Sequence, residues 1–351
     1  MIAQDLRLLL LFNGLSEHAY LFADSLSPYF KKVQVLGAYK QEYNIYKGVI
    51  DSKLYYEKYN ALFHFGNIND ILKNVDIILG IDHGCLNHLS VIKKTYPNIK
   101  VGCQILDYPY HIINKNSKTY KESTAYIWDV WLKVIPQLDF IVYNFYSTYD
   151  FLKKYNNNPN IIHTYPVKQI LISDIVKNNY IIYSGRMDGD KEIYFIIEAL
   201  SMMEQKYDYK FVIITASQND QYDYKKFASL LRVPIEIYYK MNEEDKYKLY
   251  AGCLCTTYVG APAIPGLCVK EGMSFGKNAV VFGFDEYKMI YGMHTIEYAD
   301  PYNIKDLSMC YERMFNEEYK EKNKNERLRI FKDFLSYDSW ASSIEELVYK
   351  L

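Results

Sequence analysis

The chain has 351 residues, half of them apolar, and a formal net charge of −1. This length suits two domains of roughly 150–180 residues, and the balanced charge excludes a broad basic surface of the kind that binds nucleic acids. No apolar run approaches the roughly 18 residues of a membrane-spanning helix. We therefore expect no transmembrane segment, although the excess of Lys and Arg in residues 1–170 is compatible with peripheral membrane contact.

The six cysteines are scattered and lie mostly in apolar runs. Cys253 and Cys255 are too close together for a zinc knuckle, and no second pair accompanies them. We expect buried, reduced thiols, no metal site and a cytoplasmic location. We interpret the 38 tyrosines first as a compositional bias and only secondarily as stacking surfaces for sugars or bases.

The first half alternates strand-like and helical patterns, which indicates a parallel α/β sheet. Apolar runs predict strands over 6–12, 32–36, 75–81, 99–106, 140–143 and 161–165. Amphipathic runs predict helices over 18–29, 123–134 and 147–154, the first capped by Ser16 and the last by Ser147.

After a linker candidate at 168–179, the same alternation starts again. Strands are expected over 180–184, 211–216, 235–239, 254–258, 278–282 and 295–298, with helices over 191–205, 222–231, 243–251 and 268–276. We predict two Rossmann-like α/β domains, 1–168 and 169–335, followed by a terminal helix, 336–351. Their main crevice should lie at the carboxyl ends of both sheets.

Two cations mark the start of the second domain. Arg186 and Lys191 follow the apolar run 180–183 and stand where a helix is expected to begin. Gly266 precedes another helix, and Glu271 lies in that helix's first turns. Cations and helix N-termini facing one crevice suit a diphosphate, and a neighbouring carboxylate suits a ribose diol. This pattern predicts an enzyme or binder of nucleotide-diphosphate compounds.

The second half resembles the donor domain of the family-4 retaining glycosyltransferases, which have the GT-B fold of two Rossmann-like domains. Ser184-Gly185-Arg186 followed by Lys191 matches that family's Gly-Arg-Leu…Lys element. The segment 239–251, which includes Met241, is similar to the one that cups the nucleotide base. Gly266-Leu267 with Glu271 matches the end of the family's Glu-rich loop, and 336–340 resembles the segment that leads a last helix back to the N-terminal domain.

The resemblance implies transfer of a sugar from a nucleotide-diphosphate sugar of UDP or GDP type, with retention and without a metal or other cofactor. It implies that Arg186 and Lys191 hold the diphosphate, that Glu271 binds the ribose hydroxyls, and that Gly185, Met241, Gly266 and Leu267 belong to the donor site. The acceptor, whether glycan, lipid or protein, is left open.

The first domain offers weaker signals. The Gly14 loop after the first strand leaves room for phosphate or donor sugar at a helix N-terminus. Asp107 and His111 follow a strand end, where the resemblance implies a His that contacts the donor sugar, and either position fits. His83 also ends a strand and is a further candidate.

One position departs from the family pattern. The family's first loop Glu falls on Ala263, and no acid stands beside it in 260–265. Two alternatives to an active transferase therefore stay open. One is a nucleotide-sugar-binding protein that has lost catalysis, and the other is an epimerase on the same scaffold, which would need carboxylates that this loop lacks.

Overall fold

The computed structural model describes residues 3–12, 17–37, 62–64, 71–106, 126–170, 172, 179–187, 189–204, 207–216, 223–260 and 266–351. The chain divides into two compact units, one made of 1–166 with 337–351 and the other of 167–336. It therefore passes between the units twice. The expected domain boundaries, 168/169 and 335/336, lie within two residues of these crossings.

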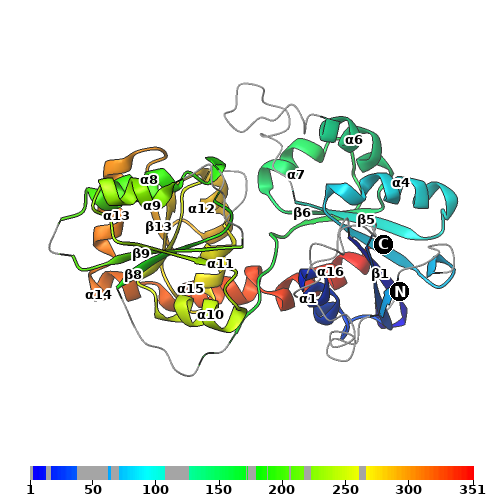
Figure 1. The fold of residues 1–351 in the computed structure, drawn as a ribbon. Coiled ribbons are helices and arrows are strands. Elements are labelled where there is room, and N and C mark those ends of the chain that lie inside the picture. Colours follow the sequence, from blue (N-terminus) through cyan, green and yellow to red (C-terminus); the bar gives the residue numbers. More distant parts are fainter. Residues whose placement is uncertain are drawn as a thin grey trace. The chain divides into compact units, whose positions relative to one another are not determined.

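The first unit contains a seven-stranded parallel sheet with the order β3-β2-β1-β4-β5-β6-β7, of which Figure 1 labels β1, β5 and β6. Its strands are β1 (Arg7–Phe12), β2 (Lys32–Gly37), β3 (Leu62–His64), β4 (Ile77–Ile81), β5 (Lys100–Ile105), β6 (Phe140–Tyr143) and β7 (Asn160–Ile162). The order reverses between β1 and β4, which is the topological switch point of a doubly wound sheet. Because both faces are covered, the strands β1, β4 and β6 consist almost entirely of buried apolar residues.

Helices cover the two faces of this sheet: α1 (Glu17–Leu26), α4 (Leu86–Thr95), α6 (Tyr126–Val134), α7 (Tyr146–Leu152) and α16 (Tyr337–Val348). Alternate residues of β1 decide which helix packs where. Leu8 and Leu10 belong to the core that contains α1 and α16, whereas Leu9 and Leu11 belong to the core that contains α4 and α6. The strand period of two therefore builds two separate apolar layers.

The C-terminal helix α16 is an integral part of this first core. Trp340 is fully buried, its ring packs edge-on against Phe22 at 4.4 Å, and its Nε1 donates to Gln104 Oε1 at 3.1 Å. The last helix was expected to pack on the N-terminal half, and Trp340 makes its aromatic contact and its hydrogen bond with residues of that half.

The second unit contains a six-stranded parallel sheet with the order β10-β9-β8-β11-β12-β13. Its strands are β8 (Tyr180–Ser184), β9 (Lys210–Thr215), β10 (Ile235–Tyr239), β11 (Cys255–Tyr258), β12 (Ala279–Phe282) and β13 (Glu297–Ala299). The order again reverses once, between β8 and β11, so this sheet has its own switch point.

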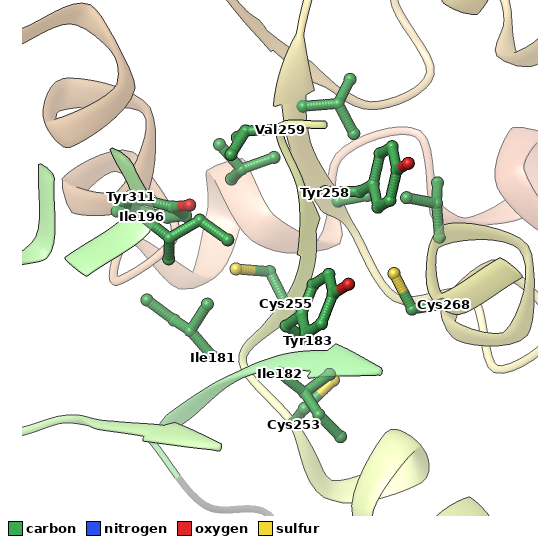
Figure 2. Packing of buried hydrophobic residues seen from close by; sticks show 14 of the residues in the cluster. Ile181, Ile182, Tyr183, Ile196, Cys253, Cys255, Tyr258, Val259, Cys268 and Tyr311 are labelled. Atoms are coloured by element: carbon green, nitrogen blue, oxygen red, sulfur yellow. The ribbon is translucent and has the colours of Figure 1, made fainter. Parts of the chain in front are cut away.

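The helices of the second unit are α8 (Ile193–Ser201), α9 (Tyr224–Leu230), α10 (Glu243–Gly252), α11 (Leu267–Met273), α12 (Asp285–Tyr291), α13 (Ile304–Arg313), α14 (Glu317–Glu321) and α15 (Lys324–Ile330). Figure 2 shows that Cys255 and Tyr258 point to opposite sides of β11. Thr257, on the side of Cys255, bonds through its hydroxyl to Tyr311 of α13, whereas Tyr258 lies on the side that α11 covers. The sheet is therefore enclosed by helices on both faces.

Some sequence-based element limits were wrong. Ser147 does not cap α7, because the N-cap position is Phe145 and the helix begins at Tyr146. The helix expected from residue 191 begins at Ile193 instead. Glu192 has a left-handed backbone, φ 53°, which separates a short 3₁₀ turn, Gly189–Lys191, from α8. This break places Lys191 in a turn before the helix rather than in its first turn.

Candidate functional site

The switch point of the second sheet gathers the described candidate residues of the second half except Met241, which follows the edge strand β10. Gly185 and Arg186 directly follow β8, and Gly266 leads from the segment after β11 into α11. Since β8 and β11 are parallel neighbours, both chain ends leave the sheet at the same edge. Ligands of open α/β sheets bind at this edge, at the switch point.

Two stacked tyrosine rings lie at this edge of the sheet. The rings of Tyr183, on β8, and Tyr258, on β11, lie nearly parallel, with centroids 6.4 Å apart and an interplanar angle of 12°. Figure 2 shows both rings next to Cys268, the second residue of α11. The Tyr183 hydroxyl donates to the main-chain oxygen of Arg186 at 2.6 Å. This bond fixes the backbone of the loop while the Arg186 side chain stays exposed.

The other tyrosine, Tyr258, holds the side chain of Lys191. This lysine is only 7% exposed, and its ammonium donates to the Tyr258 hydroxyl at 3.4 Å and lies 5.8 Å from that ring's centroid. The distance is within the range of a cation–π contact. The ammonium of this buried lysine therefore lies close to the carboxyl edge of the sheet, where Tyr258 ends β11.

Both loops leave little space for a side chain at the glycine. A Cβ on Gly185 would lie 2.9 Å from the Tyr183 hydroxyl, and one on Gly266 would lie 2.4 Å from the Tyr258 ring. Gly266 is also the N-cap of α11, with no side-chain cap bond, and Leu267 is the helix's first residue. The backbone of both loops therefore sits directly on the tyrosine pair.

Glu271 is the fifth residue of α11, and its carboxylate forms an ion pair. Lys246 of α10 donates to its Oε1 at 2.6 Å, and the two side chains are 22% and 9% exposed. Tyr250, one turn further along α10, is fully buried. Burial, and then the negative charge of Glu271, raise the pKa of Tyr250 well above its usual range.

Met241 lies in the turn between β10 and α10. Lys240 has a left-handed backbone, φ 52°, and its amide bonds to the carbonyl of Thr215 at the end of β9. Asn242 then caps α10 by accepting from the Asp245 amide. Met241 is half-buried against the core, whereas its neighbours Lys240 and Asn242 are exposed.

Several expected positions lie outside the described residues. They are Gly14, Asp107, His111 and Ala263. His83 is described: it follows β4 at the switch point of the first sheet, and its amide donates to Asp82 Oδ1 at 2.6 Å. Asp82 has φ 84° and ψ 153°, a conformation that residues other than glycine rarely adopt and that costs of order 1–3 kcal/mol.

The sequence reasoning missed Tyr183, Tyr258, Lys246 and Tyr250. Treating the tyrosines as compositional bias concealed the first two, although both end a predicted strand next to a glycine loop, which is the signal that could have identified them. Lys246 carries no such signal, because its role depends on the packing of α10 against α11.

A cavity of about 570 Å³ lies elsewhere in the second unit, at the amino ends of β12 and β13. Its wall includes Arg327, which is 1% exposed and donates to the carbonyls of Gly276, Thr295, Lys322 and Lys320. These bonds connect α15 to the segments before β12 and β13, so the burial of Arg327 has a structural explanation. The cavity lies opposite the loops that carry the predicted site.

None of the six cysteines, all within the described residues, forms a disulfide, and all are buried as expected. Burial raises the pKa of both Cys253 and Cys268 to about 12, which keeps these thiols protonated at neutral pH. Within the described ranges, no three His, Cys, Asp or Glu side chains gather as a metal site. Searched over the same ranges, no helix is long and apolar enough to cross a bilayer.

No protein-family model matches the sequence. No curated protein matches it either. Solved structures do match the whole chain. Anabaena HepE, solved in complex with UDP and glucose, is 13% identical, with a TM-score of 0.74 over 99% of this chain and 100% of that one.

Two further solved structures match over a similar extent. The sucrose-phosphate synthase of Thermosynechococcus elongatus is 10% identical, with a TM-score of 0.72 over 98% of both chains. A glycosyltransferase of Rickettsia africae is 14% identical, with a TM-score of 0.70 over 99% of this chain and 98% of that one. At such identities the likeness establishes the fold alone. The chain has the GT-B fold of two Rossmann-like α/β domains, as the sequence predicted.

Proposed function

We propose that this protein is a glycosyltransferase that transfers a sugar from a nucleotide-diphosphate sugar, with retention and without a metal. The second unit would bind the donor, and the first would bind the acceptor. The observation that carries the proposal is the arrangement at the switch point of the second sheet. Two cations follow β8, and a carboxylate stands on the helix after β11.

The roles follow from charge and position. Arg186 and Lys191 would bind the diphosphate and stabilise the negative charge that builds on it as the sugar leaves. Glu271 would accept hydrogen bonds from the ribose diol, and the turn at Met241 would face the base. Gly185, Gly266 and Leu267 would bring main-chain amides close to phosphate. In the proposed front-face route, the leaving phosphate takes the proton of the acceptor hydroxyl, so no separate protein base is needed.

Binding tests the proposal before any acceptor is known. Melting temperatures would be measured with UDP, GDP, ADP, CMP and the matching nucleosides, because a ligand that binds only the folded state raises the melting temperature. We expect a rise with at least one nucleoside diphosphate and a smaller one with its nucleoside. No rise with any diphosphate at millimolar concentration would contradict the proposal.

UDP-glucose is the first donor to test, since the structurally similar HepE was solved with UDP and glucose. We expect slow release of UDP from the donor in water and faster release when an acceptor is present. Comparing hydrolysis of UDP-glucose, UDP-galactose and UDP-N-acetylglucosamine would define the sugar.

The alternative is a nucleotide-sugar-binding protein without catalysis, and Ala263 in place of the family's Glu favours it. In an active transferase, Ala263→Glu should leave turnover unchanged or lower it, because a new charge would enter an occupied, poorly hydrated site. In a binder, the wild type should bind nucleotide without turning over any donor, and Ala263→Glu could restore some release of UDP. Measurable transfer by the wild type would exclude the binder.

A further inference from the structure

The ion pair between Lys246 and Glu271 differs from the other charge pairs of α10. Its two side chains are 22% and 9% exposed, whereas those of Lys248 and Glu244 on the same helix are 48% and 73% exposed at the same 2.6 Å separation. An exposed pair contributes about 0–1 kcal/mol. A pair withdrawn from water costs desolvation of both ions, so its presence in this place calls for a reason.

The pair joins two helices rather than two turns of one helix. Lys246 comes from α10, after the edge strand β10, and Glu271 from α11, after the central strand β11. The ammonium also lies 5.4 Å from the Tyr247 ring and 5.9 Å from the Tyr250 ring. With its ammonium on a carboxylate and close to two buried rings, Lys246 has few ways to move.

The charge of this pair matters beside a diphosphate. A lone carboxylate near Arg186 and Lys191 would repel phosphate and would weaken the attraction of those cations for it. Lys246 offsets that charge and occupies Oε1. An ion-paired carboxylate still has lone pairs that can accept hydrogen bonds from two neighbouring hydroxyls.

We propose that Lys246 is a positioning residue that fixes the Glu271 carboxylate and offsets its charge, so that it can accept hydrogen bonds from the ribose diol of a nucleoside diphosphate. The inference rests on the proposed function and adds to it the residue that makes the carboxylate compatible with an anionic ligand. Lys246 acts through Glu271 and not by touching the ligand.

The test is a double-mutant cycle read with two ligands. Binding of UDP and of 2′,3′-dideoxy-UDP would be measured by calorimetry for wild type, Lys246→Met, Glu271→Gln, the double variant and the exposed control Lys248→Met. If another base binds better in the nucleotide panel, the same ligand pair with that base is used. Lys246→Arg is included because it keeps the charge if Lys246→Met fails to fold.

We expect Lys246→Met and Glu271→Gln each to weaken UDP binding by roughly tenfold, as the loss of one charge-assisted bond would. Glu271→Gln should weaken binding of the dideoxy ligand no more than about twofold. Lys246→Met should weaken it less than it weakens UDP binding, because the unpaired Glu271 carboxylate still repels the diphosphate, and the double variant should be no weaker than Glu271→Gln alone. Lys248→Met should bind like wild type, and Lys246→Arg should retain most of the affinity.

Two results would overturn the inference. An equal loss for both ligands would mean that Lys246 acts as a general positive charge. Unchanged UDP binding by Lys246→Met would mean that the pair serves only the fold. Both results require a wild type that binds nucleoside diphosphate. A wild type that binds none would overturn the proposed function and the inference together, so failure of the inference alone is distinguishable from failure of the proposed function.

Discussion

Two tyrosine hydroxyl groups hold the two candidate phosphate-binding residues, Arg186 and Lys191. Tyr183 binds the backbone of Arg186, and Tyr258 accepts the ammonium of Lys191. Both rings are nearly or fully buried. The Arg186 backbone and the Lys191 ammonium are therefore held in place by these bonds, and such preorganisation reduces the entropy lost when a ligand binds.

The two cations should contribute separately to diphosphate binding. Charge-assisted bonds to phosphate are worth roughly 1.5–3 kcal/mol each, so Arg186→Ala and Lys191→Ala should each weaken nucleoside-diphosphate binding about ten- to a hundredfold. Binding of the nucleoside alone should change little. Calorimetry with both ligands measures this, with the exposed Arg329→Ala as control. Equal affinity of wild type and both variants would remove these residues from the site.

Lys270 should make stability depend on pH. It is 1% exposed, and burial lowers its pKa from 10.5 to about 7. The unfolded chain keeps this proton up to about pH 10.5, so folding must release it between pH 7 and that value, and stability rises with pH across this window. Relative to Lys270→Met, the wild type should gain about 1.4 kcal/mol per pH unit.

Urea unfolding of both proteins at pH 6.5, 7.5 and 8.5 measures that difference. The comparison must be made between the two proteins, because burial raises the pKa of Cys253 and Cys268. Above about pH 8.5, cysteines ionise in the unfolded chain while these buried thiols stay protonated in the folded protein. The free energy of unfolding therefore falls as pH rises in that range. A constant difference between wild type and Lys270→Met over the series would contradict the prediction.

At the scale of elements, caps and turns decide where the site-bearing helices start. Asn242 caps α10, and α10 carries Lys246 and Tyr250. The left-handed Glu192 ends the turn with Lys191 before α8 begins. The amphipathic pattern of each helix was visible in the sequence, but such a pattern does not show a single-residue break in the backbone.

Asn242→Ala should destabilise the second unit by about 0.5–2 kcal/mol, because the Asp245 amide loses its acceptor. Asn242→Ser should retain most of the stability, since Ser caps as well as Asn and, unlike Asp, brings no carboxylate against Asp245, which accepts from the Asn242 side chain at 2.7 Å. Chemical denaturation and hydrogen exchange of the α10 amides would measure both effects. An equal loss in the two variants would show that the amide group of Asn242, and not its capping oxygen, is what matters.

At the scale of the whole molecule, the last helix ties the end of the chain to the first unit. Removing the buried ring in Trp340→Ala should cost about 3–5 kcal/mol, and Gln104 would lose the donor to its oxygen. We expect hydrogen exchange to speed up in β5 and α1 while β8 and β11 keep their protection, because those strands belong to the other compact unit. Equal loss of protection in both units would mean that they unfold as one.

Much of this protein was determined by its sequence alone. Largely apolar runs of four to eight residues predicted the strands, and their limits for β6, β8 and β10 agree with the structure. For β6 and β8 the reason is that a strand buried on both faces is apolar along most of its length. The alternation of strands and helices predicted two doubly wound domains, and the motifs around Arg186 and Gly266 predicted a site at one sheet edge. These features depend on neighbours along the chain.

Only the tertiary structure decided which side chains meet. The stacking of Tyr183 on Tyr258 requires that β8 and β11 be neighbours, although 70 residues lie between these two strands. The pairing of Lys246 with Glu271 requires α10 to pack on α11, and the burial of Lys191 and Lys270 depends on what covers them. No local pattern encodes these contacts, because each joins two segments whose separate sequences look like ordinary strands and surface helices.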